Sequence, residues 1–233
     1  MIQRHFQDSR GTYGSPRLHA LLQQQGIRTS RKRVVRLMQR AELKARAARV
    51  YRRIPGTKAF FAKCPNRLPA GTVRHDQVWV ADITFLRLPG RWHYLAVVMD
   101  KHSRRILGWS LGSRRTVELT LTALQRAVVN RSPKPGLVFH TDRGVEFGGY
   151  LFCDRLKDLG IVQSMNRPKE MNDNAHMESF FHSLKSEQLA GHRFDTEHQL
   201  ASAIRSYIQR YNGHRLHSSL GYRTPIDYER LAA

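Results

Sequence analysis

The chain has 233 residues, with 40 Lys and Arg against 18 Asp and Glu, a formal net charge of +22 and a pI near 11.1. Its length and its 40% hydrophobic residues suffice for one medium domain plus a small one. The charge favours nucleic acid as the partner; an anionic membrane surface is the weaker alternative, because no long basic amphipathic helix carries an aromatic stripe. The chain has no apolar run long enough to span a membrane and no signal peptide, so we expect a cytoplasmic protein without a membrane partner.

The basic residues are concentrated near the start of the chain. Residues 1–77 hold 18 of the 40 Lys and Arg but only 3 of the 18 Asp and Glu. The two cysteines, Cys64 and Cys153, form no CxxC pair and indicate neither a disulfide framework nor a zinc finger. An N-terminal basic module followed by a more ordinary globular domain is the expected organisation.

Residues 1–45 are predicted to form a small all-α module of the helix-turn-helix type. The first predicted helix runs from Arg17 to Gln25, Gly26 ends it, and Ser30 caps the second. The second helix has an apolar stripe of Val34, Leu37, Met38 and Ala41. Its candidate DNA-binding residues are Arg31, Lys32, Arg36 and Arg40. The alternative is a helical bundle with a solvated basic face.

Residues 46–77 are interpreted as a basic linker interrupted by prolines and glycines, and residues 78–233 as the main domain with a helical tail. Three β-rich segments in the main domain, 78–88, 93–99 and 105–111, predict an antiparallel meander. Helices at 116–129 and 147–159 and strands at 137–141 and 161–164 follow, with a long helix from near Asp173 and another at 197–211. This order predicts an α/β fold with a mixed five-stranded sheet flanked by helices.

Three acidic side chains are the candidate catalytic residues of this domain. Asp82 lies within the first strand, where a carboxylate is costly to desolvate unless it is paired or binds a cation. Asp142 follows the strand 137–141, at the strand end where α/β sheets place ligand sites. Glu178 borders the apolar stripe of the long helix, and Lys185 lies two helical turns further along the same face.

Divalent cations of the magnesium type need hard oxygen ligands that converge from different elements, and a strand Asp, a strand-end Asp and a helix Glu can supply them. Each acid also has an ordinary alternative as a sheet-edge, turn or solvated helix residue. With 18 acidic residues in the chain, the pattern alone does not decide between these alternatives. His140 and His176 flank two of the acids and are expected to be structural, while the aromatic residues Trp79, Phe180 and Phe181 are expected in the core.

The spacing of these acids resembles a known family. Between Asp142 and Glu178 lie 35 residues, and Lys185 follows Glu178 by two helical turns, as in the catalytic core of DDE transposases and retroviral integrases. The chain is most similar to the OrfB-type transposases of bacterial insertion sequences. The similar segments are Tyr13-Gly14-Ser15-Pro16-Arg17, Trp79-Val80-Ala81-Asp82-Ile83-Thr84, His140-Thr141-Asp142-Arg143-Gly144, Asp173-Asn174-Ala175-His176-Met177-Glu178-Ser179-Phe180-Phe181, and Tyr211-Asn212 with His217.

The resemblance implies an RNase H-like integrase catalytic core that cleaves and joins DNA at the ends of an insertion sequence. It implies that Asp82, Asp142 and Glu178 bind two Mg²⁺, which Mn²⁺ can replace, and that Lys185 contacts DNA. The implied partners are the terminal repeats and target DNA, further copies of the chain, and a DNA-binding protein from an upstream reading frame. The implied location is the bacterial nucleoid.

One departure from the family leaves alternatives open. Family members usually carry more residues before the segment that matches Ile2. The chain is therefore interpreted as a catalytic subunit, a shortened reading frame or a relic unable to transpose unaided. Two other functions remain as alternatives: a catalytically inactive or truncated DNA-binding regulator of transposition, and another nuclease on the same fold, such as an RNase H or a junction resolvase.

Overall fold

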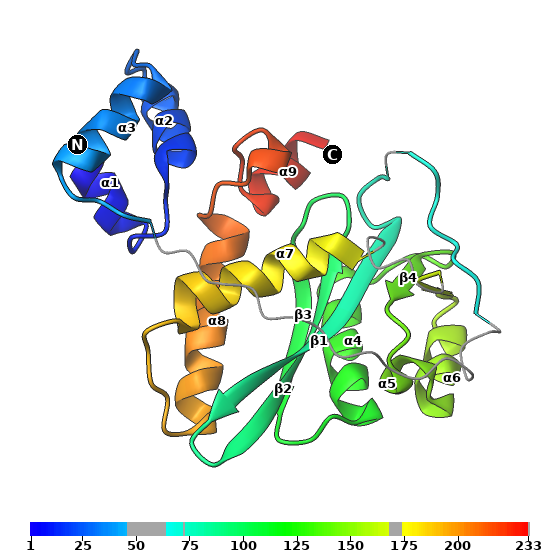
Figure 1. Ribbon diagram of the computed structural model, residues 1–233. Helices are drawn as coiled ribbons and strands as arrows, with labels where there is room; N and C mark the ends of the chain where they lie inside the picture. Colours follow the sequence, from blue (N-terminus) through cyan, green and yellow to red (C-terminus); the bar gives the residue numbers. More distant parts are fainter. Residues whose placement is uncertain (46–63, 72, 168–173, 233) are drawn as a thin grey trace.

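A five-stranded sheet lies at the centre of the larger part of the protein (Figure 1). The structure is a computed structural model that describes residues 1–45, 64–71, 73–167 and 174–232. The strands are β1 (Val78–Leu88), β2 (Arg91–Asp100), β3 (Ile106–Gly112), β4 (Val138–Thr141) and β5 (Val162–Met165). Their order across the sheet is β3-β2-β1-β4-β5, with β1, β2 and β3 antiparallel and with β4 and β5 parallel to β1. The predicted mixed sheet and the antiparallel meander are confirmed.

The two faces of the sheet are buried by different helices, because side chains alternate along each strand. Trp79, Ala81 and Ile83 of β1 belong to a core with α4 (Val117–Arg131), α5 (Val145–Gly148) and α6 (Tyr150–Asp158). Val78, Val80 and Leu86 point the other way, into a core with α7 (Ala175–Leu184) and α8 (Glu197–Gly213). Asp82 therefore lies on the face that α7 and α8 cover (Figure 1).

Glycine allows α4 to approach the sheet at one point on β3. A Cβ atom at Gly108 would lie 2.2 Å from the carbonyl oxygen of Ala123 and 2.6 Å from the backbone nitrogen of Ala127. Contacts this short are not tolerated, so only glycine fits between β3 and α4. This close packing holds one helical layer firmly against the sheet.

The prediction of one helix over residues 147–159 was wrong in detail. The segment forms two helices, α5 and α6, with Gly149 in an extended conformation between them. A Cβ atom at Gly149 would lie 2.8 Å from Cγ2 of Val117, so the chain turns there to pass the start of α4. The break depends on a tertiary contact.

The long predicted helix is also interrupted. The stripe of Met177, Phe180, Phe181 and Leu184 is buried as expected, but α7 changes into a π-helical turn, η2 (Lys185–Leu189). The expected start near Asp173 lies outside the described residues. The remaining elements are a 3₁₀ turn, η3 (Ser218–Leu220), and a last helix, α9 (Pro225–Ala232), which was not predicted. In the ranges that the structure describes, no helix is long and apolar enough to cross a membrane.

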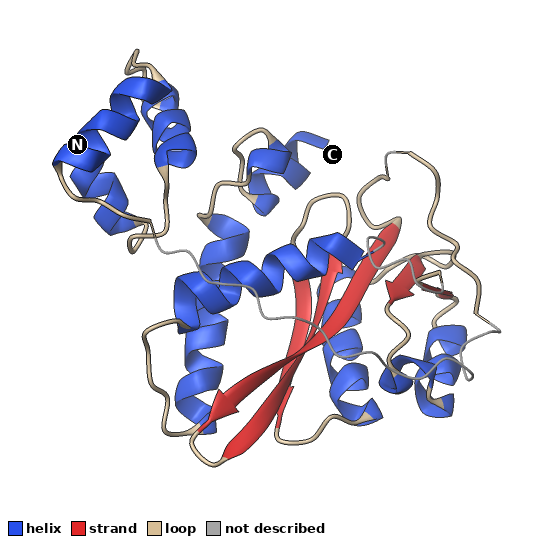
Figure 2. Cartoon of the chain, in the orientation of Figure 1, coloured by secondary structure: helices blue, strands red, loops and turns tan. Residues whose placement is uncertain are grey.

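The N-terminal module consists of helices only, as Figure 2 shows. It contains α1 (Ile2–Asp8), which was not predicted, α2 (Ser15–Gln24) and α3 (Arg31–Arg40). Gly26 follows α2 with a φ of +78°, and the side chain of Ser30 accepts a hydrogen bond from the backbone nitrogen of Arg33, so the predicted stop and cap are confirmed. Val34 and Met38 are buried, whereas Leu37 is 38% exposed, so the expected apolar stripe is narrower than predicted.

Candidate active site

Two of the three predicted catalytic acids lie at adjacent strand positions. The last paired residues of the parallel strands β1 and β4 are Ala81 and Thr141, and Asp82 and Asp142 follow them directly. Both carboxylates are half-buried, and Oδ1 of Asp82 accepts a hydrogen bond of 2.7 Å from the backbone nitrogen of Ile83. The parallel pairing of β1 with β4 thus places both acids at the same end of the paired segment.

The loop after Asp142 is shaped around its carboxylate. Oδ1 of Asp142 accepts a hydrogen bond of 3.0 Å from the backbone nitrogen of Gly144. A Cβ atom at Gly144 would lie 3.0 Å from this oxygen and 3.1 Å from Oε2 of Glu146. Glycine at this position therefore lets two carboxylates approach the same point.

Glu146 is a polar residue of this loop that the sequence analysis missed. It is 5% exposed, and Arg115 forms a 2.8 Å ion pair with its Oε1. Its Oε2, by contrast, is buried and has no hydrogen-bond partner among the described residues. A buried carboxylate oxygen is costly to leave unpaired, and this one lies beside Asp142 across Gly144.

The helix α7 brings the third acid toward the same strands. Asn174, its N-cap residue, donates a hydrogen bond of 3.3 Å from Nδ2 to the carbonyl oxygen of Ala81, directly before Asp82. Glu178 lies one turn further along the helix and is exposed. Burial lowers the pKa of half-buried Lys185, and the nearby negative charge of Asp82 partly opposes that shift. Glu178 and Lys185 therefore lie on the helix that covers Asp82.

The described residues contain no ready-made metal cluster, because nowhere among them do three His, Cys, Asp or Glu residues lie close enough together to hold an ion. The structure brings Asp82, within β1, and Asp142, at the end of β4, to neighbouring positions just past the last paired residues of these strands, but leaves Glu178 exposed on α7. The donor atoms at these positions are hard carboxylate oxygens, the ligands that Mg²⁺ and Mn²⁺ prefer.

The two flanking histidines lie in different environments. His140 is fully buried, and its ring nitrogens lie 2.9 Å from Oγ of Ser164 and 2.7 Å from Oδ1 of Asn166, which ties β4 to the β5 segment. His176 is half-buried; burial first, and then the positive charges of Arg104 and Lys101, lower its pKa to about 4. His176 is therefore neutral at pH 7.

The predicted DNA-binding residues of the N-terminal module form one solvent-facing surface. On α3, Val34 and Met38 face the small core of the module. The four candidate side chains on this helix, Arg31, Lys32, Arg36 and Arg40, are all exposed, and so is a fifth basic residue, Arg33, which was not among the candidates. We call these four residues the basic face of α3.

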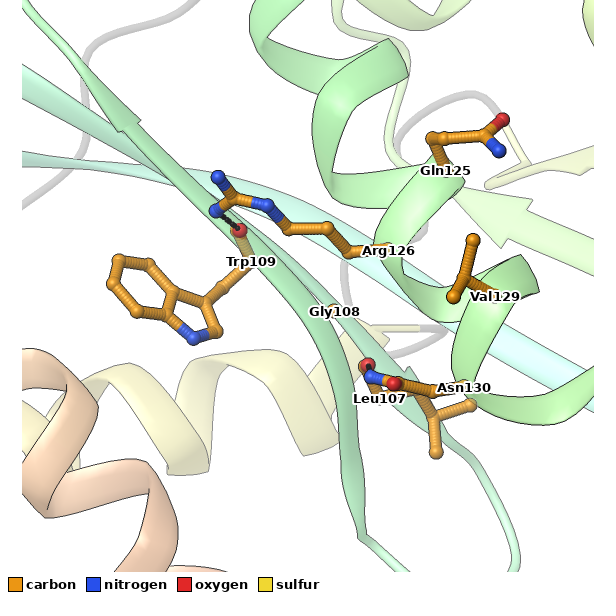
Figure 3. A pocket seen from close by; sticks show the side chains of 7 residues that line it. All are labelled: Leu107, Gly108, Trp109, Gln125, Arg126, Val129 and Asn130. Atoms are coloured by element: carbon orange, nitrogen blue, oxygen red, sulfur yellow. Dashed lines mark hydrogen bonds between the residues drawn. The ribbon is translucent and has the colours of Figure 1, made fainter.

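A shallow hollow of about 240 Å³ lies elsewhere, between β3 and α4 (Figure 3). Arg126 and Asn130 of α4 donate hydrogen bonds of 2.6 and 2.7 Å to the carbonyl oxygens of Trp109 and Leu107 of β3. None of its lining residues is an acid or a histidine. The hollow is therefore a seam between secondary-structure elements, separate from the carboxylates.

A second group of charged residues was missed by the sequence analysis. Glu187 is 5% exposed and accepts hydrogen bonds of 2.6 to 3.1 Å from Arg215. Burial would raise the pKa of Glu187, but the hydrogen bonds from Arg215 and the charges of Arg215, Arg17 and Arg210 outweigh it, so the pKa is lowered. Nothing in the polar sequence around Glu187 indicates that this residue is buried.

The five-stranded mixed sheet flanked by helices and the N-terminal helical module define a protein of the integrase class with a helix-turn-helix-like module. Models of the integrase core domain match residues 73–170 and 159–225, and a model of an HTH-like domain matches residues 1–51. The catalytic core domain of HTLV-2 integrase, solved in complex with magnesium, superposes with a TM-score of 0.54 and 19% identity over 66% of this chain and 97% of that one. A chain of the simian T-cell lymphotropic virus intasome gives a TM-score of 0.58 and 14% identity over 98% of this chain and 74% of that one.

The relatives with higher sequence identity are transposases of bacterial insertion sequences. The transposase for insertion sequence element IS904 of Lactococcus lactis is 34% identical over 98% of this chain and 92% of the relative. The transposase InsF for insertion sequence IS3A of Escherichia coli is 35% identical over 96% of this chain and 79% of the relative. The chain belongs to this family of DNA transposases of bacterial insertion sequences, as its sequence motifs predicted.

Proposed function

We propose that the chain is a DDE-type polynucleotidyl transferase in which Asp82, Asp142 and Glu178 bind two Mg²⁺, or two Mn²⁺ in their place. The observation that carries the proposal is the placement of Asp82 and Asp142 directly after paired residues of β1 and β4. The contact from Asn174 to Ala81 supports the inclusion of Glu178, because it anchors the start of α7 beside Asp82. Because Glu178 is exposed, its side chain would have to turn toward Asp82 and Asp142 to bind a cation together with them.

The reaction assigned to this site is phosphoryl transfer on DNA at the ends of an insertion sequence. Water attacks a phosphodiester, the bond to the 3′ oxygen breaks, and a 3′ hydroxyl is freed. That hydroxyl then attacks a second phosphodiester, so that one P–O bond forms as another breaks and the strands are joined. Divalent cations supply activation of the attacking oxygen and stabilisation of the leaving oxygen. The role of the three carboxylates is to hold the cations in place, and no covalent enzyme intermediate is needed.

DNA affinity in this proposal comes from basic side chains. The basic face of α3 (Arg31, Lys32, Arg36 and Arg40) contacts double-stranded DNA of the terminal repeats, and Lys185 contacts DNA close to the reacting phosphate. The domain division proposed is a module at 1–45, a basic linker at 46–77 and a catalytic core with a helical tail at 78–233. The first strand, β1, begins at Val78, in agreement with that division.

The proposed partners follow from the reaction. Two element ends must be brought together, so we propose that copies of the chain assemble on DNA in the bacterial nucleoid. A DNA-binding protein from an upstream reading frame is a further proposed partner.

The proposal is tested by the variant Asp82→Asn. Mg²⁺-dependent joining of a 3′ end is expected to fall on the order of 1000-fold, because a neutral amide replaces a metal-binding carboxylate. Binding of Mn²⁺, measured by calorimetry, is expected to weaken in parallel. Affinity for terminal-repeat DNA is expected to stay nearly unchanged, since it comes from Lys and Arg.

The matched control is Glu118→Gln, which removes an exposed carboxylate at the start of α4. This control is expected to behave like the parent. If Asp82→Asn joins DNA as fast as the parent, the assignment is wrong. If the unsubstituted protein binds DNA in a gel-shift assay but never cleaves it, the protein is a DNA-binding regulator. If it cleaves an RNA–DNA hybrid in preference to terminal-repeat DNA, it is another nuclease.

A further inference from the structure

The N-terminal module contacts the segment that follows α8. The hydroxyl of Tyr13 donates a 3.1 Å hydrogen bond to the carbonyl oxygen of His214 and accepts one of 2.9 Å from the backbone nitrogen of Leu216. Nε of Arg17 donates to the carbonyl oxygen of Leu216 at 2.9 Å. The Leu216 side chain is itself buried in the core of the module, next to Leu18. The contact therefore joins residues about 200 positions apart.

Glu187 lies at the centre of this contact, surrounded by three arginines. Arg215 binds both of its oxygens through Nε and a terminal nitrogen, a bidentate arrangement. Arg17 lies 3.6 Å from Oε1 and Arg210 lies 3.4 Å from Oε2. The hydroxyl of Tyr207 donates to Oε2 at 3.2 Å. A buried carboxylate with this many partners is stable in only one arrangement of the surrounding segments, because any displaced guanidinium leaves an uncompensated charge.

The helical turn that contains Glu187 is continuous with α7, the helix of the candidate active site. Glu187 belongs to η2, which begins at Lys185 where α7 ends. The carboxylate Glu178 lies earlier in that continuous helical segment. One helical segment therefore carries a proposed catalytic acid, a proposed DNA contact and the residue that binds the N-terminal module. π-Helical turns are rare and are frequently found at functional sites.

We propose that Glu187, Tyr13, Arg17, Arg210 and Arg215 form a positioning contact, the Glu187 junction, which holds the DNA-reading module at one fixed orientation to the catalytic helix. DNA bound to the basic face of α3 then reaches the carboxylates at a set distance along the duplex, and cleavage occurs at one position. The Glu187 junction joins the core that contains Leu216 to the helical segment, α7 and η2, that bears Glu178. Its role in cleavage rests on the proposed function, whereas its role in orientation does not.

The junction is tested with Glu187→Gln and Tyr13→Phe in the full chain. Spin labels at Gln23→Cys and Lys157→Cys, both exposed positions, report the distance from module to core in a background of Cys64→Ser and Cys153→Ser. The parent is expected to give one narrow distance distribution. Glu187→Gln is expected to broaden it at least about twofold, because three arginines lose their countercharge. Tyr13→Phe, which loses two hydrogen bonds and no charge, is expected to broaden it less.

Cleavage supplies the second measurement. In both variants, cutting at the correct terminal position is expected to fall roughly tenfold relative to cutting at neighbouring phosphates, because misplacement of the reacting groups reduces rates steeply. Affinity for terminal-repeat DNA is expected to change less than about threefold, since the basic face of α3 is untouched. The controls are Glu118→Gln and Tyr150→Phe, an acid and a tyrosine that are both exposed.

Each outcome is decisive. Distributions as narrow as in the parent overturn the Glu187 junction. A broadened distribution with an unchanged cleavage position supports its role in orientation and overturns its role in setting the position of cleavage. If Glu187→Gln fails to fold, Tyr13→Phe still carries the test. A parent that cannot cleave DNA contradicts the proposed function alone, because the distance measurement does not depend on activity.

Discussion

The catalytic core and the N-terminal module are built in different ways. Both buried clusters of the core draw their residues from positions 73 to 211, and they cover the two faces of one sheet. The module has a smaller cluster, and one of its buried members, Leu216, comes from the far end of the chain. The core thus contains the residues that stabilise it, whereas the module depends on a segment that follows the core.

The two regions also use charge differently. In the core, charged side chains pair with one another; Glu229, for example, is 7% exposed and lies 2.7 Å from Arg105. On the module, the basic face of α3 is exposed to solvent. Paired charges fix a structure, while exposed basic charges are available to an anionic partner. We expect the core to supply chemistry and rigidity, and the module to supply DNA affinity.

The largest effect is expected when the packing of the core is disturbed with Gly108→Ala. The new methyl group would overlap backbone atoms of Ala123 and Ala127, so we expect the free energy of unfolding to fall by about 3 kcal/mol or more. Urea denaturation measures it. Gly213→Ala is the control, because its new Cβ atom meets nothing nearer than 3.8 Å. Equal urea midpoints of unfolding for the two variants would mean that α4 can move away from β3 without loss of stability.

A second variant tests how much of the affinity for DNA comes from the basic face of α3. Replacing Lys32, Arg36 and Arg40 with Gln is expected to weaken DNA binding on the order of 100-fold at low salt and to reduce the salt dependence by about three phosphate contacts. Binding titrations at several salt concentrations measure both quantities.

The control for this variant replaces three exposed basic residues of the core, Arg91, Lys157 and Arg193, which removes the same total charge. It is expected to bind nearly as the parent does. If both triple variants lose affinity equally, net charge and not the basic face of α3 determines DNA binding.

A smaller effect is expected from pH at the boundary between the two regions. Burial, together with the positive charges of Arg215, Arg17 and Arg104, lowers the pKa of His217 to about 3. The folded state therefore keeps His217 neutral while the unfolded state takes up a proton below a pH of about 6.5, so stability is lost as pH falls from that value. We expect this residue to contribute about 2 kcal/mol of loss between pH 7 and pH 5.

The variant His217→Phe tests this expectation because it keeps a ring against Tyr211, which lies 4.5 Å away between ring centroids, and removes the titrating group. Its unfolding free energy, measured across that pH range, is expected to decline less steeply than that of the parent. An identical slope would show that the histidine takes up its proton in the folded state as readily as in the unfolded state.

Local sequence patterns were sufficient for most of the fold. The three β-rich segments at 78–88, 93–99 and 105–111 predicted the meander, and the apolar stripe of the long helix predicted the buried face of α7. The helix break at Gly149 was not predictable, because it arises from a contact with Val117. The sequence contains a start signal for helix α9 that was missed, a Thr directly before a Pro. Pro225 is the first residue of α9, and the hydroxyl of Thr224 accepts a hydrogen bond from the backbone nitrogen of Asp227.

The candidate site was predictable to a different degree at each residue. Parallel pairing of β1 and β4 explains why Asp82 and Asp142 lie together, whereas the sequence predicted a mixed sheet without specifying this pairing. The side-chain direction of Glu178 and the burial of Glu146 and Glu187 depend on tertiary packing. For those three acids, sequence supplies the residue type and only the folded chain supplies the surroundings.

The burial of Leu216 in the N-terminal module has a consequence for synthesis of the protein. Domains commonly fold as they leave the ribosome, the first-made part before the rest. Here the helices of the module precede, by about 200 residues, a side chain that belongs to their core. A nascent chain that has not yet reached Leu216 therefore presents a module whose core lacks one of its buried side chains.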